Sequence, residues 1–175
     1  MRVIGGEFRS RRLKSIPGLA TRPTTDRLRE TLFDILGAQV KDAVFLDAYA
    51  GTGAVGIEAL SRGAARAVFI EKSKNAAKVL RENLASLGVE GRALVVPGTV
   101  MSSIAAHKVD IVFLDPPYDR EAEYGHALKV LAGQPVKLVI VQHSVRFTLA
   151  EFYGALKRTR TLKQGDNALS FYALV

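Results

Sequence analysis

The sequence contains no cysteine. The chain can therefore form no disulfide, zinc–thiolate site, iron–sulfur cluster or thiol nucleophile, and this composition favours a cytoplasmic protein. It also lacks an apolar run near the roughly 20 residues needed to span a bilayer, and its first residues hold no signal-peptide hydrophobic region. We therefore expect no membrane association. The three histidines are too scattered for metal-ligand spacing, so we expect no metal site either.

Acidic residues are few relative to basic ones. The chain has 25 Lys and Arg against 17 Asp and Glu, which gives a formal net charge of +8. Such an excess favours a polyanionic partner such as nucleic acid, although many basic proteins carry their charge only for solubility. With 175 residues, 48% of them hydrophobic, the chain is expected to fold as one compact globular unit.

From residue 43 onward, short apolar runs alternate with amphipathic stretches, which is typical of parallel strands joined by crossover helices. The expected strands are residues 44–46, 67–71, 93–96, 109–114 and 137–141. The expected helices are residues 55–60, 73–87, 101–106, 121–131 and 149–156. Residues 158–164 and 168–174 flank a Gly-Asp-Asn turn and predict an antiparallel hairpin. The fold class is therefore α/β, with a mostly parallel sheet and a C-terminal hairpin.

Residues 1–42 are expected to form a basic appendage to a main domain of residues 43–175. We expect a small hairpin over residues 2–16 and a helix over residues 25–36, capped by Thr24 or Thr25. Residues 2–22 carry six basic side chains and the single acid Glu7, enough to neutralise several phosphates, although a solvated surface would have the same composition. The candidate nucleic-acid contacts are Arg2, Arg9, Arg11, Arg12, Lys14, Arg22, Thr24 and Arg27.

A glycine-rich loop follows the first predicted strand. Residues 51–56 match the G-x-G-x-x-G pattern of dinucleotide sites, and Glu71 at the tip of the next strand can accept hydrogen bonds from ribose hydroxyls. Asp47, however, lies near where the pyrophosphate of a dinucleotide would rest, and two anions there repel each other. S-adenosylmethionine has no phosphate and carries an ammonium and a sulfonium. We therefore expect S-adenosylmethionine as the cofactor, ahead of NAD.

The stretch Asp-Pro-Pro-Tyr follows the central strand. Its two prolines fix the backbone near φ of about −65° and donate no backbone hydrogen bonds, so they can present neighbouring acceptors rigidly. Hydrogen bonds from an exocyclic amine to the Asp115 carboxylate and the Pro116 carbonyl favour a tetrahedral nitrogen whose lone pair points at a methyl donor. The ring of Tyr118 can stack on the base. The candidate catalytic residues are Asp115, Pro116, Pro117 and Tyr118; the alternative is a loop that only ends a buried strand.

The chain resembles the RsmD-type family of bacterial methyltransferases, which modify the guanine N2 amine in 16S ribosomal RNA. The resemblance extends over nearly the whole chain and is most specific at residues 22–33, Arg-Pro-Thr-Thr-Asp-Arg-Leu-Arg-Glu-Thr-Leu-Phe, with further matches at residues 2–6, 47–53, 58–63 and 115–118. It implies a class I, Rossmann-like methyltransferase fold of seven strands. It also implies that Asp47, Gly51, Gly53 and Glu71 contact S-adenosylmethionine, and we add their neighbours Ala48, Tyr49, Thr52 and Lys72, with Gly98 and Thr99, as candidate cofactor residues.

The chain departs from the family pattern at two strand ends. After the third predicted strand, where many class I enzymes place an acidic or amide residue against the adenine amino group, it has Gly98 and Thr99, and Thr99 is a weak substitute. After the fifth, relatives often have an acidic residue where this chain has Gln142 and His143. The roles of Gln142 and His143 therefore stay open.

The sequence thus predicts S-adenosylmethionine-dependent methyl transfer to a guanine N2 amine of 16S ribosomal RNA. We expect a monomer that acts on the small subunit or an assembly intermediate. One alternative is a DNA adenine or cytosine amino methyltransferase with the same catalytic loop. Another is a basic module that docks on ribosomal RNA without turnover.

Overall fold

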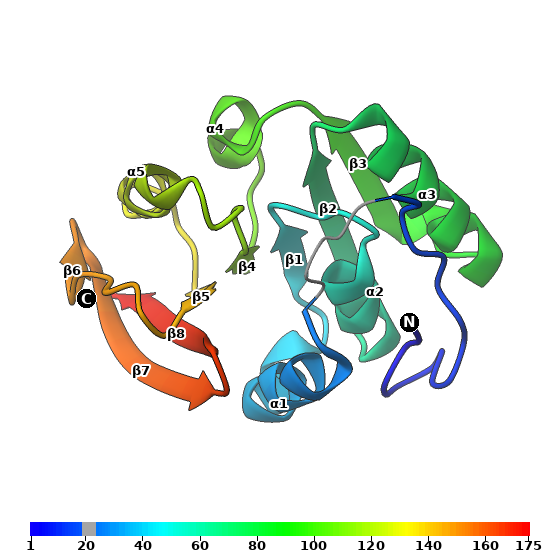
Figure 1. Cartoon of the computed structure of the whole chain (residues 1–175), viewed down its shortest axis with the longest axis horizontal. Coiled ribbons are helices and arrows are strands. Elements are labelled where there is room, and N and C mark those ends of the chain that lie inside the picture. The colour runs from blue at the N-terminus through cyan, green and yellow to red at the C-terminus, as the bar shows by residue number, and fades with distance from the viewer. Residues whose placement is uncertain (19–23) are drawn as a thin grey trace.

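The computed structural model describes residues 1–18 and 24–175 (Figure 1). Within these residues a single eight-stranded sheet forms the centre of the molecule, with the strand order β3-β2-β1-β4-β5-β8-β7-β6. The strands are β1 (Val44–Asp47), β2 (Arg66–Glu71), β3 (Ala93–Pro97), β4 (Ile111–Leu114), β5 (Leu138–Ser144), β6 (Phe152–Tyr153), β7 (Leu156–Gln164) and β8 (Asn167–Leu174). The first five pair in parallel and the last three antiparallel. The predicted α/β sheet with its C-terminal hairpin is confirmed.

Helices cover both faces of the sheet (Figure 1). One face carries α1 (Asp26–Leu36), α2 (Ala54–Ser61) and α3 (Lys74–Leu87), and the other carries α4 (Val100–Ser103) and α5 (Glu121–Leu131). The described residues also form three short 3-10 helices, η1 (Gly37–Val40), η2 (Glu90–Arg92) and η3 (Ile104–Ala106). In the described part of the chain, no helix combines the length and apolar character needed to cross a membrane.

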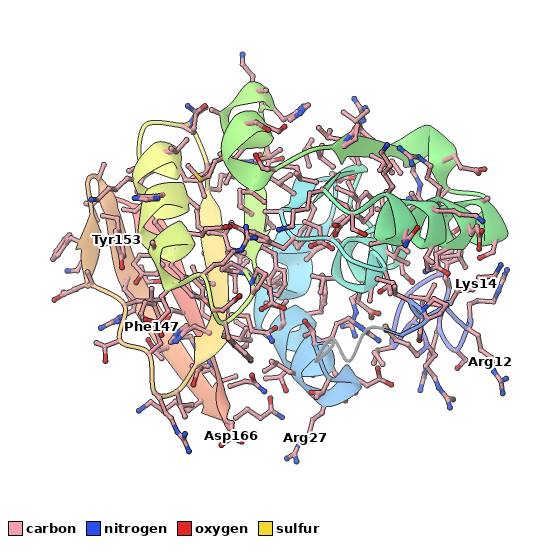
Figure 2. The ribbon with its side chains drawn as sticks, turned by 45° about the horizontal axis from the view of Figure 1, so that its top comes forward. Arg12, Lys14, Arg27, Phe147, Tyr153 and Asp166 are labelled. Atoms are coloured by element: carbon pink, nitrogen blue, oxygen red, sulfur yellow. The ribbon has the colours of Figure 1, made fainter. Side chains whose placement is uncertain are left out.

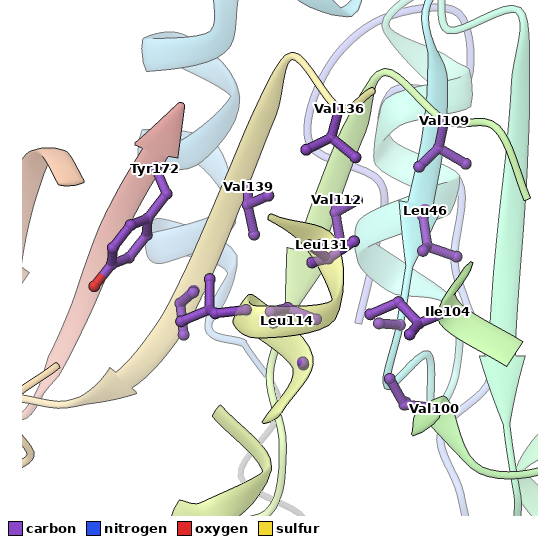
Figure 3. Close-up of a cluster of buried hydrophobic side chains, with 14 of the residues drawn as sticks. Leu46, Val100, Ile104, Val109, Val112, Leu114, Leu131, Val136, Val139 and Tyr172 are labelled. Atoms are coloured by element: carbon purple, nitrogen blue, oxygen red, sulfur yellow. The ribbon is translucent and has the colours of Figure 1, made fainter. Parts of the chain in front are cut away.

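Strand β4 shows why the sheet is so apolar. Its side chains alternate between faces: Val112 and Leu114 pack in the cluster with α5, whereas Ile111 and Phe113 pack in the cluster with α1. Figure 3 shows the first of these clusters, in which residues of α4, η3 and α5 pack on the sheet. A central parallel strand covered on both faces has no solvent side, so its sequence is continuously apolar rather than alternating.

The prediction of a helix over residues 149–156 is wrong. Residues 152–153 form β6 and pair antiparallel with the start of β7, through a tight turn at Gly154 whose φ is +58°. Leu149 and Leu156 are buried in the same core cluster, so their spacing imitates one face of a helix. A left-handed glycine and cross-strand pairing decide the conformation instead. Strand β6 is also one strand more than the seven predicted.

Strand β5 is longer than the sequence indicated. It extends beyond residue 141 to Ser144 because β8 pairs with it as far as Ser144↔Asn167. Gln142 and His143 therefore lie inside a buried strand, not after it.

The N-terminal segment forms the expected small hairpin and packs on the main sheet's helices. The Val3 amide donates to the Arg11 carbonyl over 2.9 Å, and the Arg2↔Arg12 bridge closes the pair. Val3 and Leu13 are buried in the cluster that α2 and α3 form with β2. Helix α1 begins after Thr25, whose hydroxyl accepts the Leu28 amide over 3.1 Å, so Thr25 rather than Thr24 is the cap.

A buried carboxylate, Glu58 of α2, ties this segment to the domain. Its two oxygens accept the amides of Ile4 and Gly5 over 2.9 and 2.8 Å. The Glu58 carboxylate also accepts the Arg62 Nε over 2.8 Å and lies 3.6 Å from the Nε of the fully buried Arg29. A buried charge is tolerated only when it is paired and hydrogen-bonded in this way. The hairpin is therefore part of the folded core.

A substitution at Gly6 tests whether the hairpin is packed against the domain in this way. Gly6 has a φ of +77°, and a Cβ there would overlap the carbonyl oxygen of Ser61. We expect Gly6→Ala to lower the free energy of unfolding by about 2–4 kcal/mol, the sum of backbone strain and overpacking. Urea denaturation measures this. Gly91→Ala is the matched control, because no atom lies within 4 Å of a Cβ added there; an equal effect of both changes would contradict the attachment.

Candidate functional site

A cavity of about 920 Å³ opens at the carboxyl ends of β1, β2 and β4. Loops that follow parallel strands converge at that edge, which is where open α/β sheets bind ligands. The wall of the cavity includes most residues predicted to hold a cofactor or an amine. These are Asp47, Ala48, Tyr49, Gly51, Thr52, Glu71, Lys72, Gly98, Thr99, Asp115, Pro116, Pro117 and Tyr118, together with Thr24.

Gly53, a predicted cofactor residue, does not appear in this wall. It is the N-cap of α2, with a φ of 84°, and a side chain there would collide with Leu80 of α3. Gly51 also has a positive φ, 57°, but open space surrounds the position of its missing Cβ. Gly51 thus leaves the loop backbone accessible to a ligand, whereas Gly53 allows α3 to pack against the loop.

Asp47 lies at the end of β1 and is buried. Its Oδ2 accepts the Gly56 amide over 3.0 Å. Burial raises the pKa of Asp47 to about 8; the Gly56 hydrogen bond opposes this rise, and repulsion from Asp115 and Glu71 adds to it. Three carboxylates thus share one edge of the cavity, and a bound cation would favour their ionised forms.

Glu71 holds the glycine loop in place. Its Oε2 accepts the Gly51 amide and its Oε1 accepts the Ser73 amide, both over 2.8 Å. Each carboxylate oxygen has more than one acceptor position, so Glu71 can accept hydroxyl hydrogen bonds from a ligand without releasing the loop.

Asp115 meets two residues from distant parts of the chain. The Thr24 hydroxyl hydrogen-bonds with Asp115 and also lies 3.0 Å from Oε1 of the buried Gln142. This hydroxyl has one proton, so it donates to one of the two acceptors at a time. Burial raises the pKa of Asp115 to about 7, and the Thr24 hydrogen bond opposes the rise. Gln142, whose role the sequence left open, therefore supports the hydroxyl beside Asp115.

The side chain of Tyr118 is fixed through its hydroxyl group. Its hydroxyl donates to Oδ1 of Asn167 over 2.7 Å, and the residue remains 40% exposed. Asn167 is the first residue of β8, so the terminal hairpin anchors the Asp-Pro-Pro-Tyr loop. The anchor leaves part of Tyr118 accessible to a planar ligand.

Sequence reasoning missed the first turn of α5. The Tyr49 hydroxyl donates to Glu123 Oε2 over 2.6 Å, and Arg120 Nη1 donates to Glu123 Oε1 over 3.0 Å, so this group closes one side of the cavity. An i,i+3 charge pair such as Arg120 and Glu123 usually lies on a helix surface, so the spacing gave no sign of a site. Other wall residues that were missed are Met1, Ser15, Ile16, Ala50, Ala54, Val55, Ile70, Val100, Met101 and Phe113.

The basic candidates that the structure describes are exposed but lie on different parts of the surface. Figure 2 shows Arg12 and Lys14 close together and Arg27 apart from them, on α1. Lys14 pairs with Glu82 over 2.9 Å, and Arg11 donates to the Ser86 carbonyl over 2.8 Å, so both also attach the hairpin to α3. The remaining exposed candidates are Arg2 and Arg9. Arg22 lies outside the described residues, and Thr24 is the candidate that lines the cavity.

His143 is held as a structural residue. Its Nδ1 lies 2.9 Å from the Ser144 carbonyl, which can only accept, so Nδ1 carries the proton and Nε2 accepts from Ser170 over 2.8 Å. Burial lowers the pKa of His143 and so favours the neutral ring. Among the described residues no group of three His, Asp or Glu side chains could hold a metal ion.

The chain matches the family described as conserved hypothetical protein 95 over residues 1–173. The chain belongs to this family. Two curated relatives agree with the RsmD-type assignment. Ribosomal RNA small subunit methyltransferase D of Escherichia coli (strain K12) is 47% identical over 122 residues, which are 69% of this chain and 61% of the relative. The putative rRNA methyltransferase YlbH of Bacillus subtilis (strain 168) is 33% identical over 98% of both chains.

Solved structures share the fold. A putative methyltransferase, yhhF, from Escherichia coli superposes with a TM-score of 0.86 at 38% identity and covers 99% of this chain and 97% of its own. An RNA methyltransferase from Salinibacter ruber in complex with S-adenosyl-L-homocysteine gives a TM-score of 0.68 at 18% identity, covering 87% and 93%. The predicted Rossmann-like methyltransferase fold is confirmed.

The contact of Thr24 with Asp115 is testable without activity. We expect Thr24→Val, which keeps the shape and removes the hydroxyl, to raise the pKa of Asp115 by about 0.7, since such a hydrogen bond contributes about 1 kcal/mol. Titration of the Asp115 carboxyl carbon by NMR measures it. Thr24→Ser keeps the donor and should leave the pKa near its original value. An unchanged pKa of Asp115 in the Thr24→Val variant would show that Thr24 does not hydrogen-bond with Asp115.

Proposed function

We propose that the chain is an S-adenosylmethionine-dependent methyltransferase that modifies the N2 amine of a guanine in 16S ribosomal RNA. The observation that carries this function is the meeting of Asp47, Glu71 and Asp115 at one cavity beside the Asp-Pro-Pro-Tyr loop. The first two suit a cationic adenosyl cofactor, and the third suits an amine.

The cavity fits S-adenosylmethionine in size and charge. A volume of about 920 Å³ falls within the roughly 300–1,000 Å³ of ordinary ligand sites. Burial raises the pKa of Asp47, and repulsion from Asp115 and Glu71 adds to that rise; the ammonium and sulfonium of the cofactor would relieve this repulsion. Asp47 would hold its methionine end, and Glu71 the ribose hydroxyls. When bound, the cofactor supplies a methyl group activated by the sulfonium.

Asp115 prepares the amine. Its ionised carboxylate accepts one N–H of the guanine amino group, the Pro116 carbonyl accepts the other, and the nitrogen lone pair points at the methyl group. As the nitrogen–carbon bond forms and the sulfur–carbon bond breaks, the nitrogen becomes acidic and gives its proton to Asp115 or water. Burial raises the pKa of Asp115 to about 7 in the protein without ligand, and a bound cationic cofactor would favour the ionised form. Because the ionised carboxylate orients the amine, methyl transfer is expected to fall as pH decreases below 7.

Ribosomal RNA as the substrate is supported by the names of the relatives and by the charge. Both curated relatives are named as rRNA methyltransferases, and the net charge of +8 favours a polyanion. The matched region spans 61% of the Escherichia coli relative. We propose that a cytoplasmic monomer acts on the small subunit or an assembly intermediate, because a preformed RNA shape lets a small enzyme reach its base.

The substrate assay compares three acceptors. Unmethylated small subunits, naked 16S ribosomal RNA and duplex DNA are incubated with labelled S-adenosylmethionine, and the products are digested to nucleosides. We expect N2-methylguanosine from subunits or their RNA. Label in DNA alone would indicate a DNA amino methyltransferase with the same loop. Cofactor binding with no label in any acceptor would favour a docking module.

Asp115→Ala tests the amine site. Because it removes the acceptor that orients the nitrogen, we expect methyl transfer to fall by about a hundredfold or more. The affinity for S-adenosylmethionine, measured by calorimetry, should change little. Asp119→Ala is the matched control, since Asp119 is exposed and not part of the cavity wall. Undiminished turnover without the Asp115 carboxylate would show that the amine is oriented elsewhere.

A further inference from the structure

A second hollow shares Tyr118 with the main cavity. Its volume is about 320 Å³, and its wall consists of Tyr118, Glu121, Tyr124, Ser144, Arg146 and Phe147. Tyr118 is common to this hollow and the main cavity, whereas Asp47, Glu71 and Asp115 line the main cavity alone. The hollow therefore adjoins the main cavity at Tyr118, and its wall does not include the residues that would hold the cofactor and the reacting amine.

The wall combines aromatic and charged groups. Phe147 and Tyr124 have ring centroids 5.1 Å apart at an interplanar angle of 30°, and Phe147 remains partly exposed. Arg146 is exposed and forms no ion pair with a described residue. An aromatic surface beside an unpaired guanidinium suits a planar base attached to a phosphate.

The hollow is preformed. The Phe147 amide donates to the Ser144 carbonyl over 3.0 Å, and the Arg146 amide donates to the Ser144 hydroxyl over 3.2 Å. The Val145 amide donates to the carbonyl of Asp166 in the terminal hairpin, and Tyr118 is anchored to Asn167 in the same hairpin. Figure 2 labels Phe147 and Asp166 in this region, on the α5 and hairpin side of the molecule. A fixed wall reduces the ordering that binding would otherwise require.

We propose that this hollow binds the nucleotide next to the target guanine, with its base against Phe147 and a phosphate at Arg146. The proposal rests on the proposed function. Adjacent nucleotides are joined by one phosphate, so when the target base lies beside Tyr118 in the main cavity, its neighbour must lie within one nucleotide's length. The hollow meets that requirement because it shares Tyr118. It cannot hold the target guanine, since Asp115 is absent from its wall.

The test compares two variants with two matched controls on unmethylated small subunits. Phe147→Leu removes the ring, and Arg146→Gln removes the charge without touching the core. Phe152→Leu removes an exposed ring on β6, and Arg66→Gln removes an exposed charge at the amino end of β2; neither residue lines either cavity. We expect both hollow variants to raise KM about tenfold, as base stacking and phosphate contacts contribute on this scale. Turnover number should stay within about twofold.

Unchanged KM in both hollow variants overturns the proposal. A fall in kcat at constant KM also overturns it, because it would mean that the loop only supports Tyr118. Melting temperatures exclude unfolding of Phe147→Leu, and Arg146→Gln keeps the test valid if that variant is unstable.

A second measurement separates this proposal from the proposed function. A single-stranded RNA decamer containing 2-aminopurine is titrated with the protein in the presence of S-adenosylmethionine. Stacking in the hollow should quench its fluorescence, and Phe147→Leu but not Phe152→Leu should relieve the quenching. If wild-type protein methylates no subunits yet shows this difference, the methyl-transfer assignment fails and the nucleotide site stands. Equal quenching by all three proteins overturns the site.

Discussion

The convergence of carboxylates at one edge of the sheet is the constraint on which the site depends. Parallel strands end together, so Asp47 at the end of β1 and Asp115 directly after the adjacent β4 are brought close without any sequence proximity. Placing like charges close together at a buried or partly buried site is unfavourable. The fold offsets part of that cost with hydrogen-bond donors: Gly56 for Asp47, Gly51 and Ser73 for Glu71, and Thr24 for Asp115. A cationic ligand supplies the remaining compensation.

The N-terminal segment is connected to the cavity as well as exposed at the surface. Glu58 fixes the backbone at Ile4 and Gly5, and Asn83 of α3 accepts the Lys14 amide over 2.7 Å while its own amide donates to the Thr52 carbonyl over 3.0 Å. One side chain thus connects the basic hairpin with the glycine loop. Ligands bound at the hairpin and at the glycine loop would therefore act on the same group of contacts.

The terminal hairpin has a similar relation to the catalytic loop. Asn167 at the start of β8 anchors Tyr118, and β8 pairing extends β5 so that Gln142 lies beneath Thr24. An antiparallel hairpin added to a parallel sheet thus supports the loop that we propose binds the amine. It also supplies one support of the hollow that we assign to a neighbouring nucleotide.

Most of the strands and helices could be predicted because their signals are local. Continuous apolar runs mark the buried strands, Ser73 and Gly88 mark the ends of α3, and the Asp-Pro-Pro-Tyr motif marks the loop after β4. Local signals failed at residues 149–156. The buried residues Leu149 and Leu156 have a helix-like spacing, but the segment between them forms the two-residue strand β6 and a turn. Local signals also placed Gln142 and His143 beyond a strand whose length depends on pairing with β8.

The sequence by itself determined the fold class, the acidic strand ends and the amine-binding motif, because each depends on residue types within a short stretch. Only the tertiary structure decided which groups meet. Thr24 reaches Asp115 and Gln142, Tyr49 reaches Glu123, and Gly53 packs against Leu80 instead of lining the cavity. These contacts join residues far apart in the chain, and the packing of helices on a twisted sheet, which no single stretch encodes, sets their geometry.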